Sequence, residues 1–596
     1  MQRASATPKL PGLTVLSGAT PPDGFERHGP VSLNATGEFI TRHDTPRHIV
    51  WVDGLLFAEG ERGDEARVLS ERYSAAGRTA LHEADGYYNV VVFERQTGAL
   101  VLAQDALATR PWYIYRRGGV VAVAPSPMVY RALGFPMTLS RQVLYETLRL
   151  LHPAGEESLV NEVRRMRPGV SYRLERDQSL HEQTVSDFSY RPDHAVGLDE
   201  MAREIKDIVA EAIDGVLRHP VCRARPVELS LTGGLDSRHI LGELLAQERK
   251  PRQIRHVCIK RAECAAVARI CAGEQLSLRV FELHELPWVT LIRRWLARSG
   301  GLVNLHQVYL LAMMHEVGAR GVVGFDGYLM DWLLGLVSKD NPDSITDPVR
   351  AVWGRRYTSD LMLGQLMPDS RELAARGRAK LADEAGRYQG PAWFRALMLD
   401  IQHRGVNYTG AAMALMAPEA HYFAPGATRR ALHFCRGRDI AIGGIKRARL
   451  EVMRRYFPRL AEYPDPSGRA YTEYTTLHKT TTGMGRYLTP WWRFITSGGR
   501  TDPAPESEHE WLRAIPPLRH LVAGLVEHSG LVADGLISRR GLARCWRLHQ
   551  IGGYEAWTLF SLLSAEAAYR CLVRREPQEQ VIHDWFPGVT QSDAAE

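Results

Sequence analysis

The string Ser230-Leu231-Thr232-Gly233-Gly234-Leu235-Asp236-Ser237 has the residue types of an anion-binding turn. It lies where an apolar strand is expected to end and a helix to begin. Two glycines let the backbone bend tightly and turn successive N–H groups toward an anion. The helix N-terminus adds free N–H groups and a partial positive charge. An ordinary strand–turn–helix junction with an N-capping Asp or Ser is the alternative, but the complete string at this junction favours phosphate binding.

The side chains of this string fit a nucleotide phosphate with a metal ion. Thr232 and Ser237 offer hydroxyl groups to phosphate oxygens. Asp236 carries the same charge sign as a phosphate, so its expected role is to hold a Mg²⁺ that binds the phosphate.

The elements around this turn predict a parallel sheet. From about residue 196, helices and strands alternate, and this pattern implies βαβ units with ligands at the carboxyl ends of the strands. Strands are expected at 227–231, 254–259, 278–283 and 321–325, and helices at 198–217, 236–245, 262–272 and 307–317. The remainder to about 573 is expected to be mainly helical, with a mobile loop over a site at 463–489 and a polar, frayed tail at 576–596.

The first 190 residues predict a different architecture. Short β-branched or aromatic runs at 31–33, 48–52, 88–93, 100–103, 112–115, 120–123 and 170–174 alternate with turn formers such as Gly118-Gly119. This spacing indicates packed antiparallel sheets, with a helix at 139–151. Arg191-Pro192-Asp193 marks a linker. The expected class is therefore α/β, with an α+β domain at 1–190 and a parallel-sheet domain at 196–575.

Composition excludes several protein classes. The chain has 596 residues, 45% hydrophobic and 24% charged, which argues against collagen, mucin and wholesale disorder. The net charge of +7 is spread along the chain, so no specific nucleic-acid binding is expected. Seven scattered cysteines without a C-x-x-C pair argue against a disulfide framework or zinc knuckle. Without a signal peptide or an apolar run long enough for a membrane span, the chain is expected to be cytoplasmic and reduced.

The turn resembles the pyrophosphate-binding loop of the ATP pyrophosphatases, S-G-G-x-D-S, with Thr232 where that family usually has serine. It does not match the Walker loop. The family cleaves ATP between the α and β phosphates and makes an adenylated intermediate plus pyrophosphate. The resemblance therefore implies that ATP is bound by Thr232, Gly233, Gly234, Leu235, Asp236 and Ser237.

A second segment, Asp326 to Gly335, is similar to the S-G-E-G-A-D-E-L-F-G segment of asparagine synthetases, with Gly327, Asp331, Leu333 and Gly335 matching. In that family the aspartates at the Asp236 and Asp331 positions together hold magnesium. Leu329 replaces a glycine and Trp332 replaces an acid. Tyr328 stands where β-lactam synthetases carry a tyrosine that is part of a catalytic base; a plain aromatic lining residue is the alternative.

The resemblance implies further roles for three segments. The strand end near Ile259 supplies backbone groups to adenine, and Glu263 follows in an acid-x-x-A pattern. Lys446 resembles the start of the family's late helix. The lysine expected shortly after Pro458 is missing, so Arg469, Lys446 or Lys479 is left to stabilise the reacting phosphate, with a solvated surface charge as the alternative for each.

The N-terminal region resembles the class II glutamine amidotransferase domain. The segments Gly86 to Phe93 and Leu102 to Tyr115 are similar to its G-x-F-A and L-A-R-D-x-x-G-x-R-P-L-Y-Y patterns. A working domain of this type uses an N-terminal cysteine as nucleophile. Residue 2 is Gln2 and the first cysteine is Cys222, so glutamine hydrolysis is not expected and the domain is structural or holds a substrate.

Together these resemblances, over roughly residues 30–570, imply an asparagine synthetase-like, AMP-forming carbon–nitrogen ligase that requires ATP and Mg²⁺. The missing nucleophile favours an internal amine, as in lasso-peptide cyclases and β-lactam synthetases. The expected substrate is a small molecule or peptide with a carboxylate and an amine, and a precursor-peptide maturation protease is a possible partner. The alternatives are an asparagine synthetase-like enzyme that uses ammonia or another amine, and a non-catalytic ATP-binding scaffold.

Overall fold

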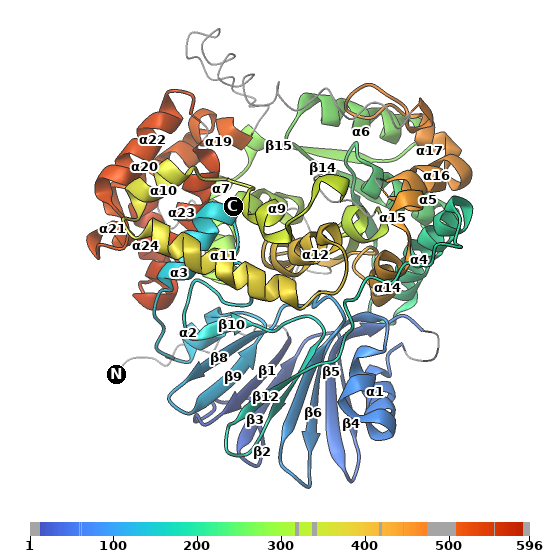
Figure 1. Cartoon of the computed structure of the whole chain (residues 1–596), viewed down its shortest axis with the longest axis horizontal. Coiled ribbons are helices and arrows are strands. Elements are labelled where there is room, and N and C mark those ends of the chain that lie inside the picture. The colour runs from blue at the N-terminus through green and yellow to red at the C-terminus, as the bar shows by residue number, and fades with distance from the viewer. Residues whose placement is uncertain are drawn as a thin grey trace.

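Two antiparallel sheets form the N-terminal part of the computed structural model and lie at the bottom of the view in Figure 1. The structure describes residues 12–587 except 59, 61, 316–320, 336–341, 417–419, 445, 474–507 and 554. One sheet has the order β10-β8-β9-β1-β3-β2 and the other β12-β11-β7-β6-β5-β4. The strands are β1 (Gly12–Ser17), β2 (Glu26–His28), β3 (Val31–Thr36), β4 (Ile40–Asp44), β5 (His48–Leu56), β6 (Gly86–Glu94), β7 (Leu100–Gln104), β8 (Tyr113–Arg117), β9 (Val120–Ala124), β10 (Val163–Arg165), β11 (Val170–Leu174) and β12 (Leu180–Thr184).

Strand β6 shows why these runs are apolar on both faces. Val91 and Phe93 belong to the core between the two sheets, whereas Val90 and Val92 pack in the cluster that includes α1 (Glu65–Ala76). Side chains alternate across a strand, so a strand covered on both sides has no polar face. Helices α2 (Met128–Ala132) and α3 (Arg141–Leu150) follow β9 in the chain and join the core of the C-terminal part.

The C-terminal part is built on a parallel sheet of the order β15-β14-β13-β16-β17. Its strands are β13 (Val227–Ser230), β14 (Gln253–Cys258), β15 (Leu278–Glu282), β16 (Val322–Phe325) and β17 (Ala420–Phe423). Helices α4 (Leu198–Arg218), α5 (Leu235–Ala246) and α6 (Arg261–Gly273) alternate with the first strands. The strand order reverses between β13 and β16, and ligands of such sheets bind in the crevice at that point.

Helices make up most of the remaining chain, as the sequence predicts (Figure 1). They are η1 (Gly77–His82), η2 (Leu283–Glu285), α7 (Trp288–Ser299), η3 (Leu305–Leu311), α8 (Ala312–His315), η4 (Met330–Leu334), η5 (Pro342–Ser344), α9 (Pro348–Trp353), α10 (Asp360–Leu366), α11 (Ser370–Gly386), α12 (Ala392–Leu399), η6 (Asp400–Gly410), α13 (Ala411–Ala414), α14 (Arg429–Gly437), α15 (Ile440–Gly443), α16 (Arg447–Tyr456), α17 (Pro458–Glu462), η7 (Tyr471–Glu473), α19 (Glu508–Ala514), α20 (Pro516–His528), α21 (Gly530–Ala533), α22 (Arg539–Gln550), α23 (Ala556–Ala568), η9 (Tyr569–Val573) and α24 (Gln578–Trp585).

The expected fold class is confirmed, with corrections in detail. The tail expected to be frayed contains α24, because Val581, Ile582 and Trp585 lie on one helix face and are buried in the core. The helix expected at 307–317 is the 3₁₀ turn η3 followed by the short α8. Within the described ranges, no helix is long and apolar enough to cross a membrane.

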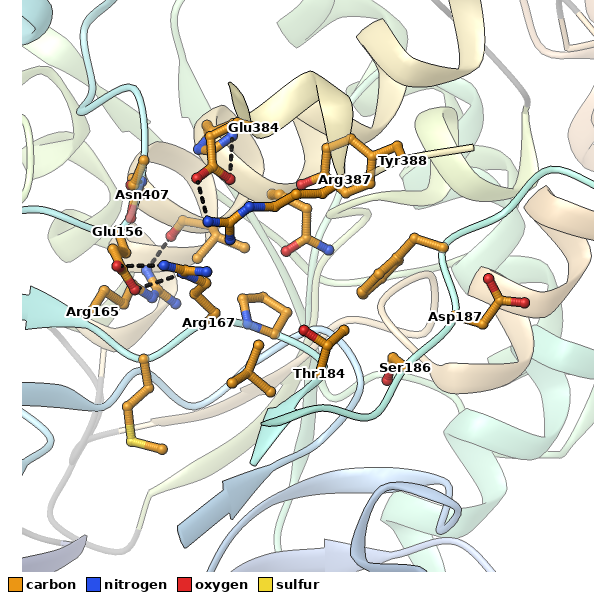
Figure 2. Close-up of a pocket in the computed structure, with 18 of the residues that line it drawn as sticks. Glu156, Arg165, Arg167, Thr184, Ser186, Asp187, Glu384, Arg387, Tyr388 and Asn407 are labelled. Atoms are coloured by element: carbon orange, nitrogen blue, oxygen red, sulfur yellow. Dashed lines mark hydrogen bonds and ion pairs between the residues drawn. The ribbon is translucent and has the colours of Figure 1, made fainter. Parts of the chain in front are cut away.

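A solvent-open pocket of about 470 Å³ lies between the N-terminal sheets and the C-terminal helices (Figure 2). Its walls come from β10, β11 and the chain after β12 on one side, and from α11 and η6 on the other.

Candidate nucleotide-binding site

The glycine turn between β13 and α5 is shaped by its own hydroxyl groups. The Thr232 N–H donates to Ser237 Oγ at 3.0 Å, and Ser237 Oγ donates to the Thr232 carbonyl at 3.1 Å. The Gly234 N–H donates to Thr232 Oγ1 at 3.2 Å. Helix α5 begins at Leu235, so the N–H groups of its first turn, including Asp236, have no partner within the helix. The first turn of α5, held in place by this network, therefore presents the backbone donors that an anion requires.

A buried arginine connects this turn to the segment that follows α17. Arg238 is fully buried, and its Nη2 donates to the Gly233 carbonyl at 3.1 Å and to the Pro464 carbonyl at 2.9 Å. Tyr471 also donates to the Gly233 carbonyl, at 3.2 Å. A Cβ atom on Gly233 would lie 2.5 Å from Cγ of Pro466, so glycine is required for this close contact. The described part of the predicted 463–489 loop thus covers the glycine turn; 474–489, with Lys479, lies outside the described residues.

Glu263, at the start of α6, lies near the turn. Burial raises the pKa of Glu263, while Lys260 and the Gly233 backbone act in the opposite direction.

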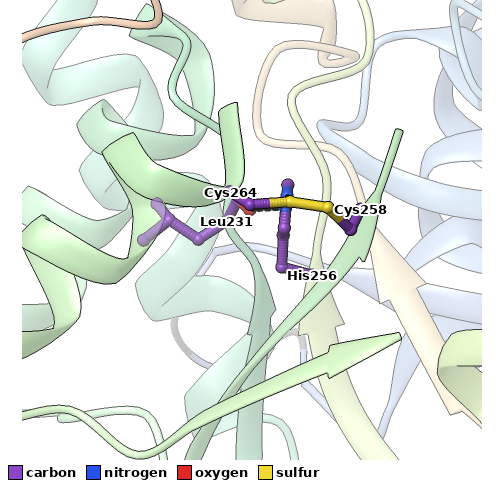
Figure 3. Close-up of a disulfide and its surroundings, with 4 residues drawn as sticks. All are labelled: Leu231, His256, Cys258 and Cys264. Carbon is purple, nitrogen blue, oxygen red and sulfur yellow. Dashed lines mark hydrogen bonds between the residues drawn. A yellow bond between two sulfur atoms is a disulfide. The ribbon is translucent and has the colours of Figure 1, made fainter. Parts of the chain in front are cut away.

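A disulfide closes the neighbouring connection, where the sequence predicted reduced cysteines. Cys258 ends β14 and Cys264 lies in α6, with their Cα atoms 5.8 Å apart (Figure 3). His256 Nδ1 lies 2.9 Å from the Leu231 carbonyl and its Nε2 lies 3.4 Å from Cys264 Sγ. The disulfide therefore fixes the loop that carries Ile259, the predicted adenine contact, beside the glycine turn.

Two aspartates that are distant in the sequence but follow neighbouring strands, β13 and β16, converge on one guanidinium. Arg449 on α16 is fully buried, and its Nη1 donates to Oδ1 of Asp236 and, at 2.9 Å, to Oδ1 of Asp331. Lys446 donates from Nζ to Oδ2 of Asp331 at 2.8 Å. The aspartate side chains remain 30% and 35% exposed, so the cluster is open to solvent.

Gly327 permits this convergence. A Cβ atom on Gly327 would lie 2.5 Å from Cβ of Asp236, which no folded structure tolerates without a shift. Leu329 and Lys446 both have left-handed backbone angles, with φ of 63° and 67°. Such conformations are costly outside glycine and persist where surrounding contacts impose them. The Lys446 N–H donates to the Gly335 carbonyl at 3.1 Å, which links the start of α16 to the turn that carries Asp331.

Electrostatics differ between the two carboxyl groups. Burial raises the pKa of Asp236, although Arg449 acts in the opposite direction. Burial also acts to raise the pKa of Asp331, but Arg449 and Lys446 together hold it below its ordinary value. The two aspartates, Arg449 and Lys446 thus form a cluster in which two negative and two positive charges balance.

This donor set does not fit a free Mg²⁺ ion. Three of the four carboxylate oxygens already accept hydrogen bonds from Arg449 or Lys446. In the part of the chain that the structure describes, no group of three or more His, Cys, Asp and Glu side chains is placed to hold a metal ion. The position between the aspartates that the resemblance gives to magnesium is taken by a guanidinium.

The other predicted residues lie apart from this cluster. Tyr328 is 7% exposed, and its hydroxyl oxygen packs against η6, where a Cβ atom added to Gly410 would lie 2.9 Å from it. Burial raises its pKa well above the ordinary value, so the hydroxyl keeps its proton, and its role as a base stays a prediction. Arg469 is exposed, in a turn closed by its backbone contacts with Asp465. Lys446 is therefore the predicted cation that the structure brings to Asp331.

Sequence reasoning missed Arg449. It follows Lys446 by three residues on a predicted helix, which places both side chains on one face. That spacing was the available signal, but nothing in the sequence distinguishes Arg449 from the other arginines of α16.

Comparisons with known proteins support the N-terminal assignment. Residues 61–184 match the model of a glutamine amidotransferase domain, as the sequence predicted. The comparison with curated proteins found no match. Two solved structures are similar at 12% identity: an allosteric regulatory enzyme of purine biosynthesis, covering 45% of this chain and 74% of that chain with a TM-score of 0.20, and glutamine phosphoribosylpyrophosphate amidotransferase from B. subtilis complexed with ADP and GMP, covering 53% and 74% with a TM-score of 0.19. Scores this low support no functional conclusion.

The matched domain holds no cysteine. The first cysteine of the printed sequence, Cys222, follows the matched residues and is 1% exposed. Burial raises its pKa to about 12, so it is not a thiolate nucleophile at neutral pH. Asp105, from the predicted L-A-Q-D segment, is buried and accepts hydrogen bonds from Leu107 and Thr109 within its own turn.

Proposed function

We propose that this chain is an ATP-dependent ligase that forms an amide bond. The observation that carries the proposal is the convergence of the glycine turn, Asp236 and Asp331 at the switch point of a parallel sheet. A carboxylate oxygen of the substrate attacks the α-phosphorus of ATP, and the bond to the β-phosphate oxygen breaks to release pyrophosphate. An amine nitrogen then attacks the acyl carbon, loses a proton, and AMP leaves with the former carboxylate oxygen.

The chain's own groups supply the charge that this chemistry needs. Backbone N–H groups of Gly233 and of the first turn of α5 bind phosphate oxygens, with the hydroxyls of Thr232 and Ser237 holding the turn. Lys446 and Arg449 place positive charge beside the leaving pyrophosphate. Because Lys446 and Arg449 are hydrogen-bonded to the carboxylates of Asp236 and Asp331, no step is assigned to a magnesium ion at these aspartates.

The amine is proposed to belong to the substrate itself. The domain at 61–184 resembles glutamine amidotransferases but contains no cysteine that could release ammonia. A substrate with both a carboxylate and an amine, closed into a ring as by a lasso-peptide cyclase, needs no free ammonia. A maturation protease as partner and a cytoplasmic location remain predictions.

A nucleotide-binding scaffold without turnover is the second candidate. One observation favours it: the Arg449 guanidinium lies between the two aspartates. That contact would have to rearrange for the aspartates to act in a catalytic complex.

AMP formation from α-labelled ATP separates these candidates. The purified chain is incubated with ATP and candidate peptides, alongside Lys446→Met and the matched control Lys250→Met, whose side chain is exposed after α5. We expect AMP formation to fall by about 100-fold in Lys446→Met, the loss usual for one electrostatic group of a site, and to be unchanged in Lys250→Met. Equal rates in Lys446→Met would refute the role of this cation in a ligase. ATP binding without AMP would favour the scaffold, and absence of ATP binding would exclude both.

A further inference from the structure

The disulfide between Cys258 and Cys264 joins two elements that lie beside the glycine turn (Figure 3). Strand β14, which ends at Cys258, pairs with β13, the strand that leads into the turn. Helix α6, which carries Cys264, packs against the turn itself, since a Cβ atom on Gly233 would lie 3.3 Å from Cβ of Ala266. The bond therefore holds this strand and this helix together next to the turn.

The connection that the disulfide spans is short and has no side-chain cap. Two residues, Ile259 and Lys260, connect β14 to α6. Lys260 is the N-cap of α6, and its side chain makes no capping hydrogen bond. Side chains that accept such bonds usually hold a helix N-terminus in place. The disulfide supplies a covalent constraint instead, so breaking it frees the connection that carries Ile259.

His256 provides a hydrogen-bond acceptor that the reduced form can use and the disulfide cannot. Burial lowers the pKa of His256, so the ring is neutral at pH 7. A carbonyl oxygen only accepts hydrogen bonds, so Nδ1 carries the ring proton and donates to the Leu231 carbonyl at 2.9 Å. Nε2 is then an unprotonated acceptor, 3.4 Å from Cys264 Sγ. A disulfide sulfur has no proton to donate, whereas a Cys264 thiol would donate its S–H to Nε2.

Access to solvent separates Cys264 from the other cysteines. All seven lie in the part of the chain that the structure describes; six are buried, and Cys264 is partly exposed. We propose that the Cys258–Cys264 disulfide is a redox switch that sets the affinity of the glycine turn for a nucleotide, with a dithiol as the reductant. This switch rests on the nucleotide site proposed above and adds its regulation.

The exchange takes two steps. A thiolate of the dithiol attacks Cys264 Sγ, the protein disulfide breaks, and Cys258 leaves as a thiolate that takes up a proton. The second sulfur of the dithiol then attacks the first, and Cys264 leaves and takes up a proton in turn. Two electrons pass from the dithiol, which becomes a cyclic disulfide, to the protein.

The oxidised chain binds the nucleotide more tightly than the reduced chain. While the disulfide is intact, the connection at Ile259 and Lys260 is already ordered, whereas in the reduced chain the nucleotide has to order it on binding. Ordering the backbone of about one residue weakens binding by about tenfold.

Titration calorimetry with ATP, on the full chain with and without dithiothreitol, measures the switch. We expect the dissociation constant of ATP to rise about tenfold on reduction. The double variant Cys258→Ser with Cys264→Ser should match the reduced chain in both conditions. Cys271→Ala is the control, because Cys271 is a free, buried cysteine on the same helix, and it should keep the tenfold response. Equal affinities of the oxidised and reduced chains would overturn the switch.

Hydrogen exchange keeps this result separate from a failure of the nucleotide site. If neither form binds ATP, the proposed function is wrong at this site. Faster exchange of the backbone amides at 232–237 after reduction would then still show that the disulfide controls the turn. Unchanged exchange at these residues would overturn the switch as well.

The variant His256→Phe tests the acceptor. Without Nε2, the equilibrium constant for reduction by dithiothreitol should fall about fivefold, the net value of one hydrogen bond. Alkylation of free thiols followed by mass spectrometry measures this constant. His284→Phe is the control, because His284 is 42% exposed in η2, and it should leave the constant unchanged. An unchanged constant in His256→Phe would overturn the inference that the site accommodates both redox states.

Discussion

Replacing Arg449 with methionine tests the charge balance of the aspartate cluster. Arg449 is fully buried and donates to both Asp236 and Asp331, so its loss leaves two carboxylates facing each other. Removing one partner of a buried ion pair costs about 3–5 kcal/mol. The aspartates keep about a third of their surface, and Lys446 still neutralises Asp331, so we expect the lower end, about 3 kcal/mol.

The free energy of unfolding is measured by urea denaturation followed by tryptophan fluorescence. Arg447→Met is the matched control, because Arg447 lies on the same helix and, within the described residues, its hydrogen bonds go to the backbone carbonyls of Gly444 and Ala441. We expect its unfolding free energy to stay within about 0.5 kcal/mol of the parent chain. If Arg449→Met is no less stable than this control, the guanidinium does not neutralise the aspartates.

Magnesium gives the same substitution a second readout. With Arg449 removed, Asp236 and Asp331 become free to share a divalent cation. Millimolar magnesium chloride should then stabilise Arg449→Met relative to sodium chloride of equal ionic strength, because a ligand that binds only the folded state raises the free energy of unfolding. The parent chain should show no such gain. An equal gain in the parent would show that magnesium binds beside the guanidinium and would refute the argument.

Three further perturbations have defined outcomes. Gly327→Ala should destabilise the chain by about 2 kcal/mol in urea denaturation, the cost of overpacking, because its Cβ would lie 2.5 Å from that of Asp236. Reducing the Cys258–Cys264 disulfide should lower the free energy of unfolding by about 2 kcal/mol, the chain-entropy value for so short a loop, and hydrogen exchange should rise at the end of β14. Burial lowers the pKa of His82 from 6.5 to about 4, so between these pH values the unfolded chain binds a proton that the folded chain does not. The free energy of unfolding should therefore fall by up to about 3 kcal/mol as the pH drops from 6.5 toward 4. His82→Leu should remove this part of the loss of stability in acid.

Each of these has a control. Gly386→Ala lies at the end of α11 with open space around the new methyl group, so it should be neutral or stabilising. Oxidised and reduced chains are compared at one pH after thiol titration, and a difference below about 0.5 kcal/mol would contradict the entropic account. His520 is exposed, so His520→Leu should leave the pH dependence unchanged; an equal effect of both histidine substitutions would contradict the assignment to His82.

The parallel sheet was largely predictable because local pattern and topology agree. The strands expected at 227–231, 254–259, 278–283 and 321–325 coincide with β13, β14, β15 and β16 to within a residue or so. Strand β17 was missed because four residues inside a helical region carry no periodic signal, and β17 is fixed by pairing with β16. In the N-terminal part, β1 was missed although its burial is complete and it pairs with β3 and β9.

The position of the site was predictable, but its charge balance was not. Asp236 and Asp331 follow neighbouring strands, so parallel pairing must bring them to one edge of the sheet. The disulfide could not be read from spacing, because Cys258 and Cys264 meet only when the start of α6 folds back against β14. Arg449 likewise becomes a partner of both aspartates only through the packing of α16 against α5 and α4.

The burial of Arg449 bears both on the stability of the aspartate cluster and on how the cluster would bind a nucleotide. Helix α16 is rich in arginine, yet Arg454 and Arg455 remain partly or fully accessible while Arg449 is completely buried. Burying a guanidinium removes its hydration, which is tolerated where carboxylates replace the lost water. Two aspartates on separate loops replace that water around Arg449. The same contacts that stabilise the cluster therefore occupy the aspartates. A nucleotide that recruits either aspartate must offer Arg449 an equivalent anion, and the phosphates of ATP are suited to that exchange.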